Sequence, residues 1–284
     1  MMVLATTSLA ACGGSSTADP CKALPNPHVN LHGCNLSDTG LPHRDLTGVN
    51  LHFGMINRTD LSGAQLIDAD LGGVEGQGAH FDNAVIDGIN LSKSDLFGAW
   101  LIGTRLDHAD VTDATLDRVR AHGATMRHLN AHGASVREAD FSNVTASSAD
   151  FTRITGERSR FDGAQLDYAD FEAASLVEAD FSRANLEHAR FPAAAFSHGK
   201  MFGTRLNDAF MSQAILDHAD FSGAHMARVD LSYADLTGAD LSGVDLLDAR
   251  TTGWRAEGVR FNNTRCPDGA IVSSPVTCPP TPPE

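Results

Sequence analysis

Nearly every fifth residue from Leu31 to Phe261 is large and apolar, and this spacing constrains the fold more than any other feature. Of these 47 positions, 40 are Leu, Ile, Val, Met or Phe. Two residues before each of them, 42 of 47 positions are Ala, Gly, Ser, Thr, Cys or Val. A period of five fits neither an α-helix nor a β-strand. The backbone must therefore turn within every unit and place one large and one small side chain inside.

The repeated unit is a small residue, Asp or Asn, a large apolar residue, Ser or Thr, and Gly or a polar residue. Residues 219–223 (ADFSG) and 239–243 (ADLSG) show it clearly. This pattern resembles the pentapeptide repeat family over residues 29–261. The resemblance implies an all-β fold: a right-handed quadrilateral β-helix (β-solenoid) of about 12 coils, each built from four repeats. Side chains twenty positions apart would then lie about 4.8 Å apart in neighbouring coils.

The repeat also predicts how the core is filled. Two phenylalanine ladders are expected on opposite sides of the core. One contains Phe141, Phe161 and Phe181, and the other contains Phe151, Phe171 and Phe191. Between Ala121 and Gly156 only four of eight central positions keep a large residue. Missing apolar volume costs contacts, so we expect local looseness or a bend there.

The sequence predicts four segments. Residues 1–11 are a truncated signal peptide-like segment without a basic start. The run Leu9-Ala10-Ala11-Cys12 resembles a bacterial lipobox, which implies lipidation of Cys12; an incidental cysteine is the alternative. Residues 12–28 would form a tether and N-terminal cap, and residues 29–261 the β-helix. Residues 262–284 would form a disulfide-closed C-terminal cap and a Pro-rich tail.

The remaining cysteines form two local pairs at the two ends of the repeat region. They are Cys21 with Cys34, and Cys266 with Cys278. An even number of cysteines flanking a rod in an exported chain favours disulfides. Metal binding is the alternative, but no His lies at ligand spacing beside them. The sequence therefore predicts no metal site and no cofactor.

One edge of the expected rod carries charges that alternate in sign every twenty residues. The predicted charge ladder contains one column of Arg120, Asp140, Arg160, Asp180, Lys200 and Asp220, and a second of Arg118, Glu138, Arg158 and Glu178. Opposite charges at this spacing attract, so we interpret the ladder as stabilising the edge. A nucleic-acid groove would need uncompensated basic charge instead. The net charge of −15 also repels phosphates, so no nucleic-acid partner is expected.

Two other surface patterns have structural interpretations that compete with functional ones. Three pairs of histidines are spaced twenty residues apart. They are His32 with His52, His108 with His128, and His198 with His218. Two histidines in a column do not complete a four-coordinate site. An acidic stripe contains Asp70, Asp110, Asp150 and Asp170. It would suit Ca²⁺ or imitate a DNA backbone, but the repeat itself places Asp or Asn there.

Large apolar residues at outward positions are candidates for a docking or homodimer surface. They are Phe97, Trp100, Ile67, Phe202, Phe210, Ile215 and Leu247. Exposed apolar patches mark partner sites, and scattered surface residues are the alternative. The sequence contains no nucleophile elbow, phosphate-binding loop, zinc motif or dinucleotide fingerprint. It therefore predicts no enzyme and no catalytic residue.

The leading hypothesis is a non-enzymatic, exported, lipid-anchored structural or protein-binding rod of the bacterial cell envelope. The membrane contact would be the lipid alone, because no apolar run is long enough to span a bilayer. The protein partner is not identified. The alternative, implied by the quinolone-resistance members of the resembled family, is a cytoplasmic acidic DNA mimic that binds DNA gyrase.

Overall fold

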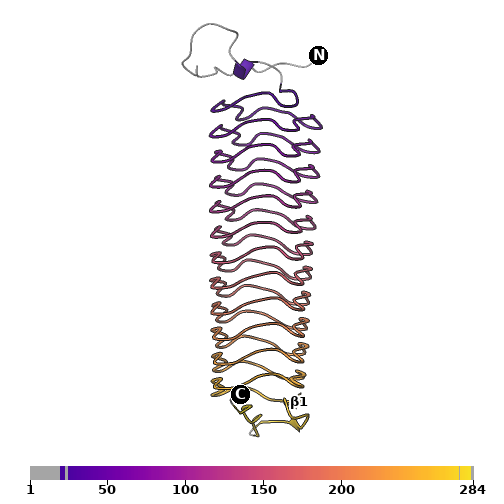
Figure 1. The fold of residues 1–284 in the computed structure, drawn as a ribbon, viewed down its shortest axis with the longest axis vertical. Helices are drawn as coiled ribbons and strands as arrows, with labels where there is room; N and C mark the ends of the chain where they lie inside the picture. The colour runs from indigo at the N-terminus through magenta and orange to yellow at the C-terminus, as the bar shows by residue number, and fades with distance from the viewer. Residues whose placement is uncertain (1–19, 23–24, 275, 283–284) are drawn as a thin grey trace.

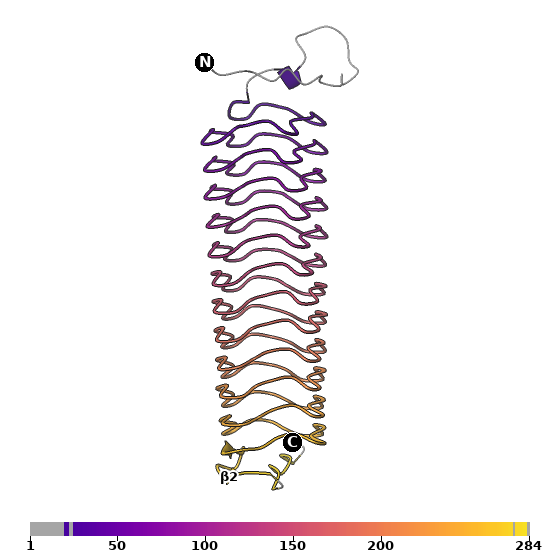
Figure 2. The same cartoon turned by 180° about the vertical axis from the view of Figure 1, so that it is seen from behind.

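The computed structural model describes residues 20–22, 25–274 and 276–282. The chain winds into a straight rod whose coils stack regularly from end to end (Figures 1 and 2). Parallel bridges join residues twenty apart in an unbroken series, from Asn30–Asn50 to Asp245–Arg265. Leu51 donates its backbone N–H to Asp70 of the next coil at 2.7 Å. The fold is a β-helix, as the resemblance to the pentapeptide repeat family implied.

Few elements of the described chain are longer than a single bridge. A 3₁₀-helix, η1, spans Pro20–Lys22, and two short strands, β1 (Thr264–Arg265) and β2 (Ile271–Val272), pair antiparallel at the C-terminal end. Elsewhere each repeat contributes one bridging residue and one tight turn. The described residues include no helix of the length and apolarity that crossing a bilayer requires.

A two-residue corner follows the inward large residue of each repeat, as His52 and Phe53 follow Leu51. The second corner residue adopts a left-handed backbone conformation, and this lets the chain turn. From His28 to Asn263, every fifth residue has a positive φ; for the non-glycine residues it lies between 53° and 61°. Within the turn, Gly54 donates its N–H to the Leu51 carbonyl at 2.7 Å. A positive φ at the third turn residue is the mark of a type II turn. Glycine is also used where space is short: a Cβ on Gly73 would lie 2.5 Å from the Phe53 ring.

The two predicted phenylalanine ladders are present in the core between residues 141 and 191. Phe161 stacks on Phe141 and Phe181 with ring centroids 5.1 and 4.7 Å apart. In the other ladder, Phe171 stacks on Phe151 and Phe191 at 5.0 and 4.9 Å. The ladders meet edge to face, the geometry that aromatic pairs favour. All of these rings are at most 2% exposed.

The expected looseness between Ala121 and Gly156 is absent, and that prediction was wrong. The bridges continue through this region without a break, and the rod does not bend there (Figure 1). At Gly156, neighbouring coils fill the space that the missing side chain leaves. A Cβ on Gly156 would lie 2.7 Å from Val136 Cγ2 and 2.8 Å from Leu176 Cδ2. At Gly156 the core keeps its packing because the large residues one coil above and one coil below lean into the gap.

Hydroxyl groups that point inward are hydrogen-bonded to the backbone. Thr59 Oγ1 donates to the Leu36 carbonyl at 2.8 Å, and Ser94 Oγ to the Leu91 carbonyl at 2.6 Å. These bonds satisfy groups that would otherwise be costly to bury. Thr125 differs: its Oγ1 is buried without a hydrogen-bond partner in the described part of the chain.

Replacing Thr125 by valine should therefore stabilise the rod. The substitution keeps the side-chain shape and removes an unsatisfied buried hydroxyl, so the free energy of unfolding should rise by about 1 kcal/mol. Denaturant titration measures the change. Thr115→Val is the matched control at an equivalent bridging position: both side chains are partly buried, but among the described residues only the Thr125 hydroxyl is a buried side-chain group without a hydrogen-bond partner. Equal effects of the two substitutions would contradict the interpretation.

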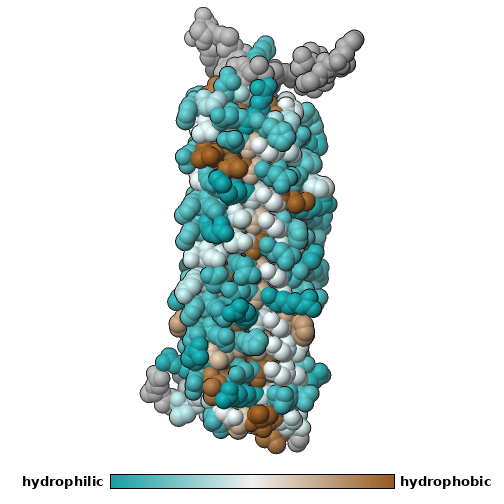
Figure 3. All heavy atoms as spheres, turned by 90° about the vertical axis from the view of Figure 1, so that its right-hand side faces the viewer, coloured by the Kyte–Doolittle hydropathy of each residue, from teal (hydrophilic) through white to brown (hydrophobic). Residues whose placement is uncertain are grey.

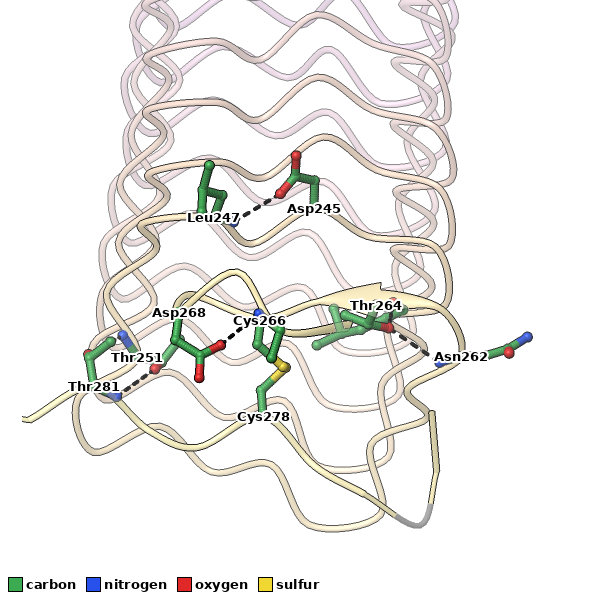
Figure 4. The surroundings of a disulfide bond; sticks show 11 residues. Asp245, Leu247, Thr251, Asn262, Thr264, Cys266, Asp268, Cys278 and Thr281 are labelled. Carbon is green, nitrogen blue, oxygen red and sulfur yellow. Dashed lines mark hydrogen bonds between the residues drawn. A yellow bond between two sulfur atoms is a disulfide. The ribbon is translucent and has the colours of Figure 1, made fainter. Parts of the chain in front are cut away.

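Both ends of the described rod carry a disulfide, with the predicted pairing. Cys21 bonds to Cys34, and Cys266 bonds to Cys278. At the C-terminal end, shown in Figure 4, the tail returns across the last coil. The Thr251 N–H donates to Thr281 Oγ1, and the Thr281 N–H donates to Thr251 Oγ1, both at 2.9 Å. The predicted signal segment 1–11 and Cys12 lie outside the described residues.

Candidate functional site

The charged edge of the rod consists of discrete ion pairs between neighbouring coils. In one column, Arg118 Nε donates to Glu138 Oε2 at 2.8 Å. Two coils further on, Arg158 Nε donates to Glu178 Oε2 at 2.7 Å. Within the described chain, no ion pair joins Glu138 to Arg158. The predicted column is therefore made of separate pairs rather than of a continuous chain of contacts.

The second column of the edge shows the same pairing over most of its length. Arg160 Nη1 lies 3.5 Å from Asp140 Oδ2, and Lys200 Nζ lies 3.7 Å from Asp180 Oδ2. Asp220 Oδ1 accepts the Ser222 N–H at 2.9 Å, a bond within its own repeat. Asp140 and Asp180 likewise accept the N–H two residues on, so they hold the local turn as well as facing a cation.

Arg120 departs from the predicted ladder. Its guanidinium carbon lies 4.2 Å from the centroid of the Trp100 ring. The other face of Trp100 stacks on His80, with centroids 5.2 Å apart. A cation held against an indole face is stabilised by the ring quadrupole. The edge thus begins with a His80–Trp100–Arg120 stack and continues as ion pairs, which leaves Trp100 half-buried rather than free to dock.

Stability should fall in acid because several carboxyls are held ionised. Hydrogen bonds from Arg58, Arg158 and Arg228 lower the pKa of Asp38, Glu178 and Asp208, respectively. A group whose pKa is lower when folded adds stability above its unfolded value, here 3.8 for Asp and 4.5 for Glu. That stability is lost as the pH falls through the lowered values. We expect the unfolding temperature to be level from pH 7 to 5 and to drop below pH 4.5; no drop would contradict this.

The outward apolar residues do not share one surface. Phe202, Phe210 and Ile215 are 46–47% exposed. Phe210 is bridged to Arg190 and Asp230, and Ile215 belongs to the next column. Figure 3 shows separate brown areas on a largely hydrophilic face. The structure therefore presents single exposed side chains among polar neighbours.

The remaining members of this set have local partners. Phe97 is 40% exposed and lies under the Arg118 guanidinium, 5.6 Å from its ring centroid. Ile67 and Leu247 are half-buried. Leu247 Cδ1 lies 3.9 Å from the place of a Cβ on Gly269, under the C-terminal turn. Leu247 therefore belongs to the end of the rod rather than to its sides.

Each of the three histidine pairs is in contact, but none belongs to a ligand cluster. His108 stacks on His128 and His198 on His218, with centroids 4.9 and 5.0 Å apart. Among the described residues, no group of three or more His, Cys, Asp or Glu could hold a metal ion. On the acidic stripe, Asp110 and Asp150 each accept the N–H two residues on at 2.9 Å. The repeat uses these carboxylates to fix its turns.

The model for a known family matches the repeat region. The model is described as pentapeptide repeats, and its overlapping matches cover residues 28–143, 157–191 and 200–248. The chain belongs to the pentapeptide repeat family. Pentapeptide repeat proteins fold as right-handed β-helices and are generally structural or binding proteins rather than enzymes. No curated protein matches this pentapeptide repeat protein significantly.

Solved structures that match include other pentapeptide repeat proteins. HetL, from the cyanobacterium Nostoc sp. strain PCC 7120, is 25% identical to this chain. The match covers 82% of this chain and 92% of HetL, with a TM-score of 0.39. QnrB1, a plasmid-mediated fluoroquinolone resistance protein, is 19% identical to this chain. The match covers 70% of this chain and 90% of the QnrB1 chain, with a TM-score of 0.37. A pentapeptide repeat protein from the Arabidopsis thaliana thylakoid lumen is 29% identical to this chain. The match covers 34% of this chain and 63% of that protein, with a TM-score of 0.25.

Sequence reasoning missed several exposed apolar residues of this pentapeptide repeat protein. They are Phe53, Met55, Ile102, Tyr168, Tyr233, Ile271 and Val276. Five of them occupy bridging or corner positions of the repeat. The five-residue register assigns these positions to the outside of the rod, so it could have identified them. Phe53 is 64% exposed beside His52, with ring centroids 4.2 Å apart. Ile271 and Val276 lie beyond the last repeat, where the register gives no guidance.

Proposed function

We propose that this pentapeptide repeat protein is an exported, lipid-anchored rod of the bacterial cell envelope. It would not be an enzyme but would present a long, rigid surface to a protein partner, or hold partners apart. Cys12 would carry the lipid, and residues 13–20 would tether the rod. The lipobox-like run before Cys12 supports the anchor, and the regular stacking of coils supports the role of a rigid spacer.

The pair of terminal disulfides is the observation that carries this proposal. Cys21–Cys34 closes one end and Cys266–Cys278 the other. Structural disulfides persist in oxidising compartments and are rare in the cytosol. Each bridge closes a short loop at an end of the rod, where a coil has only one neighbour. Disulfides at these two places favour a compartment outside the cytoplasm.

The proposal includes a four-sided cross-section and about 12 coils. Four bridging residues recur in every twenty, as in Asn30, Asn35, Gly40 and Asp45 of the first coil. A repeat of one bridge and one turn, taken four times, gives four faces. A flat face of this kind offers partners a row of evenly spaced side chains.

Cell fractionation with mass spectrometry of the mature protein tests the proposal. We expect the protein in the membrane fraction, cut before Cys12, lipidated there, and with its four other cysteines oxidised. Cys12→Ala should release the rod from the membrane fraction while both disulfides still form. An unprocessed, fully reduced chain in the cytosol would contradict the proposal.

The second candidate is a cytoplasmic DNA mimic that binds DNA gyrase. The net charge of −15 favours it. The charged edge argues against it, because arginines neutralise many of its carboxylates there. A supercoiling assay separates the two: protection of gyrase from a quinolone at micromolar protein would favour the second candidate, and no protection would favour the envelope rod.

A further inference from the structure

The C-terminal end of the rod contains a cavity of about 790 Å³. It lies between the corner of the last coils and the returning tail. Its lining includes Tyr233, Asp248, Asp268, Pro279 and Pro280. We call this cavity the end pocket. A volume of this size accommodates a small organic ligand or one long side chain.

The tail wall of the end pocket is tied to the rod at two places. The Cys266–Cys278 disulfide fixes the start of the wall (Figure 4). The reciprocal hydrogen bonds between Thr251 and Thr281 fix its far side, and Thr252 Oγ1 donates to the Pro282 carbonyl at 3.1 Å. The wall is thus part of the folded rod, held by one disulfide and by hydrogen bonds.

The apolar side of the end pocket is made of an aromatic ring and prolines. Tyr233 is 63% exposed, and its ring lies over Gly253, where a Cβ would come within 2.7 Å of the ring. Pro279 and Pro280 lie on the tail side. Prolines and a ring held by its neighbour lose little entropy when they contact a ligand. This side suits an aliphatic chain.

The polar side of the end pocket carries two carboxylates from consecutive turns of one corner. Asp248 donates its N–H to the Pro267 carbonyl at 3.1 Å, and Asp268 follows Pro267 directly. One coil earlier, Arg228 is held by both carboxylate oxygens of Asp208 at 2.7 and 2.6 Å. Arg250 also lines the cavity. Two carboxylates against one lining arginine leave an excess of negative charge.

We propose that the end pocket binds an aliphatic chain that ends in an ammonium or guanidinium group. The chain would lie along Tyr233 and the prolines, and the cation would face Asp248 and Asp268. Charge-assisted hydrogen bonds to carboxylates are the strong ones, and an aromatic ring also attracts a cation. The ligand would be a free aliphatic diamine or the lysine or arginine side chain of a protein. This site does not depend on the envelope role.

Titration calorimetry with three probes tests the proposal on the full chain. The probes are 1,5-diaminopentane, N-acetyl-lysine methylamide, and 1-pentanol as the uncharged control. We expect one site for at least one of the amines and none for the alcohol. Binding of the diamine alone would identify a small-molecule site, and binding of the lysine derivative would identify a side-chain site. No amine binding, or equal binding of the alcohol, would overturn the proposal.

Matched variants locate the binding. Asp248→Asn with Asp268→Asn should weaken amine binding about tenfold or more, because the charge-assisted bonds are lost. Asp68→Asn is the control in the same corner column near the other end, and it should have no effect. Replacing Cys266 and Cys278 by serine should also weaken binding, whereas replacing Cys21 and Cys34 should not. Unchanged binding in the double Asn variant would refute the site.

Discussion

Replacing Phe161 by alanine is expected to lower the free energy of unfolding by about 3–5 kcal/mol. Phe161 stacks on Phe141 and Phe181 and meets Phe151 and Phe171 edge to face. Truncation removes contacts with four rings and leaves a cavity between coils. Because each coil touches only its neighbours, the core cannot close over that cavity from far away. Equilibrium denaturation followed by circular dichroism measures the loss.

The control for this prediction is Phe161→Leu, which restores the commonest residue at the fifth position. It keeps most of the volume and loses the aromatic contacts, so we expect a cost of less than about 1.5 kcal/mol. A loss for Phe161→Ala no larger than for Phe161→Leu would show that the ladder does not hold the core.

Filling the gap at Gly156 with the residue that the repeat favours is expected to destabilise the rod. The repeat places a large apolar residue at this position, so Gly156→Leu restores the pattern. Val136 and Leu176 already occupy the space, 2.7 and 2.8 Å from a Cβ at this position. Overpacking of this kind costs about 1–3 kcal/mol. The unfolding midpoint in urea measures the change.

A second variant distinguishes overpacking from an effect of the backbone. Gly156→Ala adds one methyl group and should cost less than Gly156→Leu. If leucine at this position raised the unfolding midpoint, the gap would be real and the packing seen around Gly156 would be contradicted.

The sequence predicted the fold because every repeat must bury its large apolar residue, and this requirement recurs every five residues. Leu51 and Phe161, far apart in the chain, are both buried for the same reason: their fifth-residue position points inward. The phenylalanine ladders follow from that register alone. The end disulfides followed because the four cysteines flank the repeats in two local pairs.

The sequence was less informative about surfaces. The five-residue register tells in which column of the rod a side chain lies, but not which conformation it adopts or which neighbour it contacts. The columns placed Arg120 next to Asp140, yet the guanidinium turns the other way onto Trp100. Long side chains choose among neighbours on both sides, and a ring face competes with a carboxylate. The packing around Gly156 was missed for a similar reason, because it depends on how Val136 and Leu176 lean. The end pocket involves residues beyond the last repeat.

Cross-linking between engineered cysteines tests the central claim, that residues twenty apart lie side by side, most directly. Thr155 and Ser175 form a parallel bridge, and bridged residues lie about 4.8 Å apart, within disulfide reach. In a Cys12→Ser background, Thr155→Cys with Ser175→Cys should form a disulfide on mild oxidation. Thr155→Cys with Gln165→Cys should not, because the two positions belong to columns half a coil apart. A cross-link in the second pair and none in the first would contradict the fold.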